Sequence, residues 1–186
     1  MFGLFDSPEK KAQKATQFVA EMMLMTVGHL RMGPLADELF KNLIKSPYHA
    51  GYIQGKISGL LAHLVHSGKV SAENANMVSG MTLIMLFEED KARKISSAIN
   101  AHASRNEAGY QQGYERGSKV ALYSVGARDV EQEPEVERAK RQAKSAEQEF
   151  NQLFPEESGG ASSDPTMHAL MGLEIIWFTE TLSSVE

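Results

Sequence analysis

The spacing of apolar and polar positions along the chain predicts helices throughout. Two methionine-rich runs, 18–29 and 77–87, have similar apolar spacing and are typical of helices. A third run, 130–154, is highly charged and places its apolar residues three and four positions apart, as in a narrow coiled-coil seam. No two alternating runs flank an Asn-Gly or Asp-Gly turn, the usual signal of a β-hairpin. We therefore predict an all-α protein, a helical bundle of seven or eight helices.

Capping residues mark where these helices begin and end. Ser46-Pro47 places a capping side chain before a proline at the first helical position. Proline has no N–H, but an N–H at this position would make no hydrogen bond within the helix. Ser7-Pro8 and Asp164-Pro165 repeat the pattern. Glycines at 68 and 126 are typical helix stops.

Two segments of the chain resemble each other, which indicates an internal duplication. Residues 46–68 and 104–126 share nine identical positions at an offset of 58 residues. Each follows an apolar helix and a shorter polar one. We predict a single domain, 1–186, with two tandem three-helix units at 7–68 and 69–126. A charged amphipathic helix at 127–154, a flexible linker at 155–163 and an apolar C-terminal helix at 164–186 complete it.

Each repeated segment carries glycine at every fourth position, which aligns the glycines on one helix face. An interior glycine lowers helix stability by about 0.5–1 kcal/mol relative to alanine, so the pattern needs a packing or binding reason. We interpret the two stripes as sites where helices pack closely. The alternative is a groove for a partner helix or flat ligand. The candidate binding residues are Gly51, Tyr52, Gln54, Gly55, Gly59, Gly109, Tyr110, Gln112, Gly113 and Gly117.

The C-terminal helix is apolar on nearly every face, so we expect it to be buried on more than one side. It either fills the core of its own chain or docks into a second copy. Trp177 of this helix is therefore a further candidate binding residue, for self-association or partner capture. Glu174 lies among its apolar residues. Burial would raise the pKa of this carboxyl unless it is paired, and we expect pairing with an Arg, a His or a backbone amide.

Composition narrows the classes of function. The 186 residues are 42% hydrophobic and 23% charged, as in a soluble globular protein, and the net charge of −5 argues against a nucleic-acid binder. The absence of cysteine excludes disulfides, thiolate catalysis and cysteine-bound zinc. The start has no basic region before a long apolar stretch, so we expect a cytoplasmic protein.

Candidate chemistry is sparse. His63 and His66 lie one turn apart and are a weak candidate metal pair, which His29 or the acidic residues at 88–90 would have to complete. No other cofactor is expected. We interpret the methionines at 22, 23 and 25 and at 77, 81 and 85 as core residues, with a promiscuous binding surface as the alternative.

The first hypothesis is a non-enzymatic protein-binding module: an adaptor, inhibitor or regulatory subunit that acts through helix–helix contacts with a protein partner or a second copy. The alternative is a helical-bundle enzyme, or a protein that binds a metal or small ligand, with an internal pocket near His63, His66 and Glu174. A weaker hypothesis, peripheral membrane attachment, rests on three apolar residues near the start, Phe2, Leu4 and Phe5.

Overall fold

The computed structural model describes residues 6–31, 36–153 and 165–182, and within these ranges the chain is all-α, as predicted. Eight helices have ten or more residues; a 3₁₀ turn at Val130–Gln132, a π-helical segment at Ile175–Thr179 and the three-residue α9 (Glu180–Leu182) add to them. The eight are α1 (Pro8–Arg31), α2 (Ala36–Lys45), α3 (Pro47–His66), α4 (Ala72–Phe87), α5 (Glu89–Ser104), α6 (Ala108–Ser124), α7 (Val136–Leu153) and α8 (Pro165–Glu174).

Local chemistry explains several helix ends. The Ser46 hydroxyl accepts a hydrogen bond from the backbone N–H of His49 at the start of α3, directly before Pro47. Past the ends of α3 and α6, Gly68 and Gly126 have φ angles of 68° and 67°, which glycine adopts without a Cβ clash.

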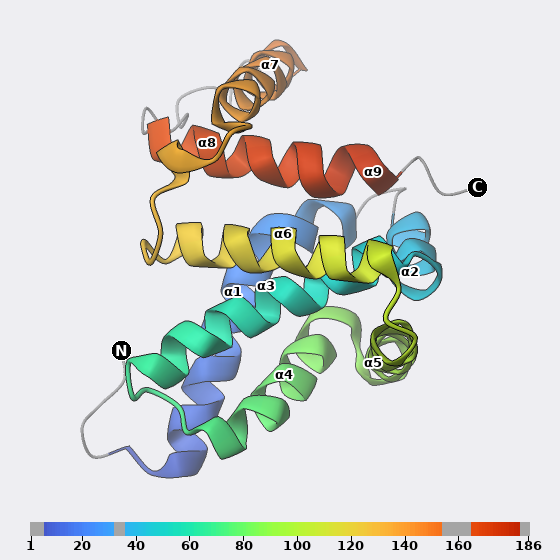
Figure 1. Cartoon of the computed structure of the whole chain (residues 1–186), viewed down its shortest axis with the longest axis vertical. Helices are drawn as coiled ribbons and strands as arrows, with labels where there is room; N and C mark the ends of the chain where they lie inside the picture. The colour runs from blue at the N-terminus through green and yellow to red at the C-terminus, as the bar shows by residue number, and fades with distance from the viewer. Residues whose placement is uncertain (1–5, 32–35, 154–164, 183–186) are drawn as a thin grey trace.

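Helices with the same rank in the two predicted units pack against each other. α1 contacts α4, α2 contacts α5, and α3 contacts α6 most extensively of all. Figure 1 shows α3 near the middle of the molecule, with α6 above it, α4 and α5 below it, and α1 passing behind it. This pairing agrees with a duplicated unit, which remains a prediction because shared helix order does not establish ancestry.

The C-terminal third forms an outer layer over α6 (Figure 1). α8 packs on α7, where Gly172 lies so close to the backbone of Ala139 that an added Cβ would overlap the carbonyl oxygen. The predicted seam of α7 is buried at Val136, Ala139 and Ala143. A narrow row of small residues lets two helix backbones approach closely, which explains the low bulk of this seam.

The segment 127–154 is not one helix, in contrast to our prediction. Residues 130–132 form a 3₁₀ turn capped by the Asp129 carboxylate, and α7 begins only at Val136. Pro134 disfavours helical geometry in the residue before it, which explains why the helix starts late. The predicted linker at 155–163 and the apolar start, Phe2, Leu4 and Phe5, lie outside the described residues. None of the described helices is long and apolar enough to cross a membrane.

Candidate functional site

The two glycine stripes face each other in the interface between α3 and α6. A Cβ added at Gly51 or Gly55 would lie 2.2 or 2.1 Å from the carbonyl oxygen of Tyr110 or Tyr114. The partner residue numbers rise together along the two helices, so α3 and α6 run parallel. Only glycine permits such an approach between two backbones.

The glycines of α6 pack against the backbone of α3 in the same way. A Cβ at Gly113 or Gly117 would lie 2.0 Å from the carbonyl oxygen of Tyr48 or Tyr52. Gly59 is also tightly enclosed, whereas a Cβ at Gly109 would make ordinary contacts, with Pro47 nearest at 3.5 Å. The packing interpretation therefore explains the stripes. The groove alternative is wrong at the closely packed glycines, because the other helix already fills the space.

The polar residues beside the stripes do not gather around one opening. Tyr52 is fully buried and Tyr110 nearly so, with the Tyr110 ring stacked on Tyr114 at 6.3 Å between centroids. The Gln54 amide donates to the Ser58 hydroxyl at 3.2 Å on the same helix. Gln112 lies elsewhere, on the outer side of α6. These four candidates do not share a site.

Glu174 is the centre of a buried polar network that joins three helices. Its carboxylate forms an ion pair with Lys56 of α3, whose ammonium also donates to the Thr26 hydroxyl of α1. Tyr52 and Thr26 donate to the two carboxylate oxygens, each at 2.9 Å. Burial, and next the Glu174 charge, raise the pKa of Tyr52 well above 10. Pairing of Glu174 was expected; the partner is a lysine rather than an arginine, histidine or backbone amide.

Trp177 belongs to the chain's own core rather than to a free surface. It is 1% exposed, and its indole N–H donates to the Glu135 carboxylate at 2.6 Å. The Tyr48 hydroxyl donates to the Trp177 carbonyl at 2.6 Å, and the Arg116 guanidinium lies over the indole ring. In this arrangement the C-terminal helix fills its own chain, and Trp177 is not available to a partner.

A second buried cluster joins the same helix to α3 through His49. Its Nε2 lies 3.0 Å from the Thr181 hydroxyl, which itself donates to the Phe178 carbonyl, so Nε2 carries the proton and donates. Its Nδ1 faces the Ser46 hydroxyl at 2.9 Å. Burial lowers the pKa of His49 to about 4, so this ring is neutral at pH 7.

His63 and His66 do not converge with Glu174. His63 lies seven residues beyond Lys56 along α3, about 10 Å further down the helix axis. No three His, Asp or Glu side chains in the described part of the chain form a group that could hold a metal ion. The side chain of His29, a possible completing ligand, lies outside the described set. The structure therefore gives the internal-pocket hypothesis no assembled site.

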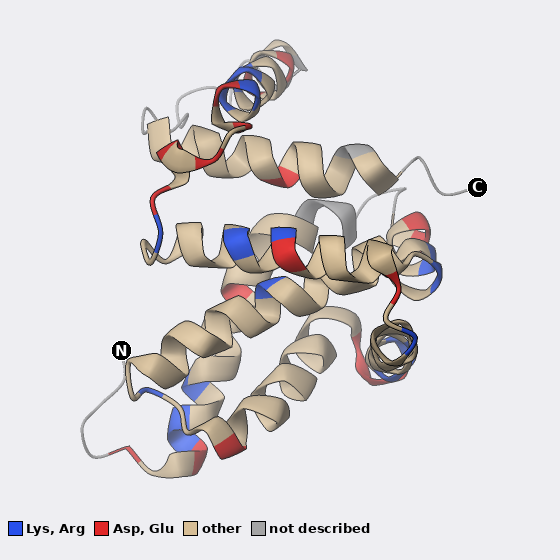
Figure 2. Cartoon of the chain, in the orientation of Figure 1, with Lys and Arg blue, Asp and Glu red and all other residues tan. Residues whose placement is uncertain are grey.

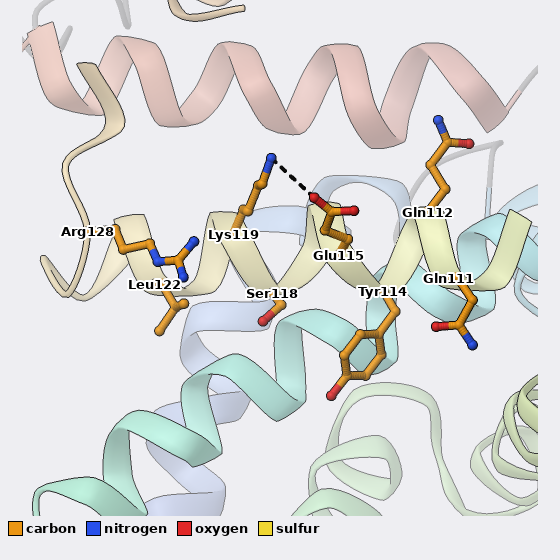
Figure 3. A pocket seen from close by; sticks show the side chains of 8 residues that line it. All are labelled: Gln111, Gln112, Tyr114, Glu115, Ser118, Lys119, Leu122 and Arg128. Carbon is orange, nitrogen blue, oxygen red and sulfur yellow. Dashed lines mark ion pairs between the residues drawn. The ribbon is translucent and has the colours of Figure 1, made fainter. Parts of the chain in front are cut away.

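The surface of the described part of the chain has open hollows, of which two lie along α6 and α5. One, of about 680 Å³, follows the outer side of α6, where Figure 3 shows the Lys119 ammonium paired with Glu115 at 3.4 Å. Its other lining residues are Gln111, Gln112, Tyr114, Ser118, Leu122 and Arg128. The second, of about 540 Å³, lies along α5 beside Ile44 and includes Arg93, Lys94 and Arg105. Among the described hydrogen bonds, none joins a nucleophilic side chain to a base along either hollow.

The outward side of α4 exposes several large apolar side chains. Met77, Met81, Ile84 and Met85 are 46, 41, 46 and 54% exposed. Gly80 lies among them, and a Cβ added there would touch no atom within 4 Å. We call these five residues the α4 face. The core interpretation is wrong for the methionines of the α4 face, because they lie on the side of α4 that faces away from the core. It is also wrong for Met25 of α1, which is 48% exposed, whereas Met23 is buried as expected.

Two features of this arrangement were missed at the sequence level. Lys56 is the only charged residue between Ser46 and Val65, and a lone lysine in an apolar helix signals a buried partner. The open side of α4 has a weaker signal: the helix is uncharged from Asn74 to Phe87 on all faces, which fits full burial equally well.

Comparisons of the chain with protein-family models, with curated proteins and with solved structures gave no match. Any functional inference therefore rests on the geometry described above.

Proposed function

We propose that this protein is a non-enzymatic protein-binding module that holds a helix of another protein against the α4 face. One observation carries the proposal: four large apolar side chains, each more than 40% exposed, lie together on one helix. A soluble domain rarely leaves a contiguous apolar surface in water unless something covers it.

The spacing of the α4 face suits a helical partner. Met77, Met81 and Ile84 lie at i, i+4 and i+7, the register in which one helix presents anchors to another. Gly80 leaves room for the partner's backbone or a large side chain to approach. Methionine is flexible at three torsions, so the face can adjust its shape to the surface that it meets.

Covering the α4 face supplies an apolar contribution to the binding free energy. Full burial of a methionine or isoleucine side chain contributes about 1.5–3 kcal/mol, so covering a half-exposed one contributes about 1 kcal/mol. Four such side chains form an apolar centre of the kind that dominates interface energies, and surrounding polar contacts add specificity.

The experiment compares two exposed methionines. Tagged wild type, Met81→Glu and Met171→Glu are used to capture proteins from the host lysate, with quantitative mass spectrometry of what is retained. Met171 is 44% exposed on α8, so it controls for the general effect of replacing a surface methionine by a charge. We expect a near-stoichiometric partner with wild type and Met171→Glu that Met81→Glu loses. Equal retention by all three proteins would overturn the proposal.

A further inference from the structure

The charges around the α4 face point to the chemistry of its occupant. From Ala72 to Asp90 the chain has four carboxylates and no lysine or arginine. Glu73 lies in the first turn of α4, and Glu88, Glu89 and Asp90 follow its last turn; all four are exposed. Between these ends α4 carries no charge, as its uncoloured ribbon in Figure 2 shows. The apolar face is therefore bracketed by negative charge.

Nearby cations on α5 neutralise only part of this charge. Arg93 forms an ion pair with Glu89, one turn away. Lys91 lies 5.7 Å from the centre of the Phe40 ring, toward α2. The hydrogen bond and the charge of Glu89 are the largest causes that raise the pKa of Arg93, and the Asp90 charge comes last. At the other end, basic residues at the start of α1 lie beside the first turn of α4 (Figure 2), and Lys10 and Lys14 among them pair with Asp6. Glu73, Glu88 and Asp90 remain as the acidic ends of the α4 face.

We infer that the occupant is an amphipathic helix whose apolar stripe is bracketed by lysine or arginine, an inference that rests on the proposed function. Glu73 and Glu88 are fifteen residues apart, or about 22 Å along a helix. A partner helix of four to five turns spans this distance, with its cations at the two ends and its apolar residues over Met77–Met85.

A second copy of the chain fits the same face poorly. If two α4 helices packed antiparallel about Gly80 and Met81, Glu73 of each would meet Glu88 of the other. A parallel pair would place each carboxylate near its own equivalent. Like charges brought together across an interface weaken association, so complementarity favours a different, basic-ended chain.

The test uses two dye-labelled synthetic helices with one apolar stripe, flanked by lysines in one and by glutamates in the other. Fluorescence anisotropy gives the Kd of each for wild type, Met81→Glu and the triple variant Glu73→Gln/Glu88→Gln/Asp90→Asn. We expect wild type to bind the lysine-flanked helix on the order of tenfold more tightly, with a preference that shrinks as salt rises. The triple variant should lose the preference while circular dichroism shows the helical content of the wild type.

The outcomes separate this inference from the function on which it rests. Equal binding of both helices, abolished by Met81→Glu, would overturn the charge inference and leave the docking face intact. Binding of neither helix, together with lysate capture insensitive to Met81→Glu, would overturn both. A reversible dimer in sedimentation velocity that Met81→Glu dissociates would identify a second copy as the occupant and overturn the inference of a basic partner.

Discussion

Helices α3 and α4 follow one another in the chain, yet α3 buries polar residues and α4 exposes apolar ones. α3 buries a lysine and a histidine, Lys56 and His49, at 1% exposure each. α4 has no charged residue between Asn74 and Phe87, yet it exposes four large apolar side chains. Hydropathy alone would place α4 inside and leave the polar groups of α3 in water.

The two helices differ in the number of other helices that pack around them. α3 packs against α6 along the glycines, against the C-terminal helix through Lys56, Tyr52 and His49, and against α1, α2, α4 and α5. α4 buries Val78, Leu83 and Leu86 against its neighbours and leaves the opposite side open. A buried polar group is stable where partners satisfy it, and an apolar face stays exposed where the fold supplies no neighbour.

The largest expected effect tests the buried charge of α3. Lys56→Met leaves the Glu174 carboxylate buried without its cation, and we expect the free energy of unfolding to fall by about 4 kcal/mol in urea denaturation. The double variant Lys56→Met/Glu174→Met removes the lone charge and should recover a large part of the loss. A single variant as stable as wild type would show that the ion pair contributes little.

Glycine-to-alanine substitutions compare the α3–α6 interface with the α4 face directly. At Gly113 the new Cβ would lie 2.0 Å from the Tyr48 carbonyl oxygen, so α3 and α6 must separate; we expect a loss of about 3 kcal/mol. At Gly80 nothing lies within 4 Å, and alanine's better helix propensity should raise the stability by about 0.5–1 kcal/mol. Thermal and urea unfolding measure the change in stability of each variant. If both substitutions stabilised the protein, or both destabilised it, the two glycines would not differ in their surroundings as described.

The pH dependence of stability tests whether α3 keeps His49 neutral. Because the pKa of His49 is about 4 in the folded chain, the unfolded chain binds a proton first as pH falls below about 6.5. Stability conferred by the neutral ring is complete above that pH and is lost toward pH 4, with about 2 kcal/mol gone by pH 5. The wild-type advantage over His49→Gln should shrink by this amount between pH 7.5 and pH 5. Carboxylates titrate alike in both proteins, so parallel stability curves would refute the assignment.

The smallest expected effect belongs to the open side of α4. Met81→Gln replaces an exposed side chain that the core does not use, so the free energy of unfolding should change by less than about 0.5 kcal/mol. Urea midpoints of wild type and variant check this. A loss of several kcal/mol would mean that Met81 stabilises the fold itself, and the α4 face would then need no partner to explain it.

Part of the candidate site was accessible to sequence reasoning. Glycines at every fourth position predicted close helix packing, because only backbone approach explains the sacrifice of helix propensity. The apolar surroundings of Glu174 predicted a buried, paired carboxylate. The identity of its partner was not predictable, since Lys56 lies 118 residues away and no local pattern connects the two.

Sequence alone predicted most of the helices, the Ser46 cap and the close-packing face of α3 and α6, because these depend on local spacing and on the absence of side chains. Which apolar helix is enclosed depends on the packing of the whole bundle. Met23 and Met81 have the same chemistry and similar apolar neighbours in the chain, yet one is fully buried and the other 41% exposed. Burial depends on how many other helices surround a position, which is a property of the whole bundle and is not encoded in the residue's own neighbourhood.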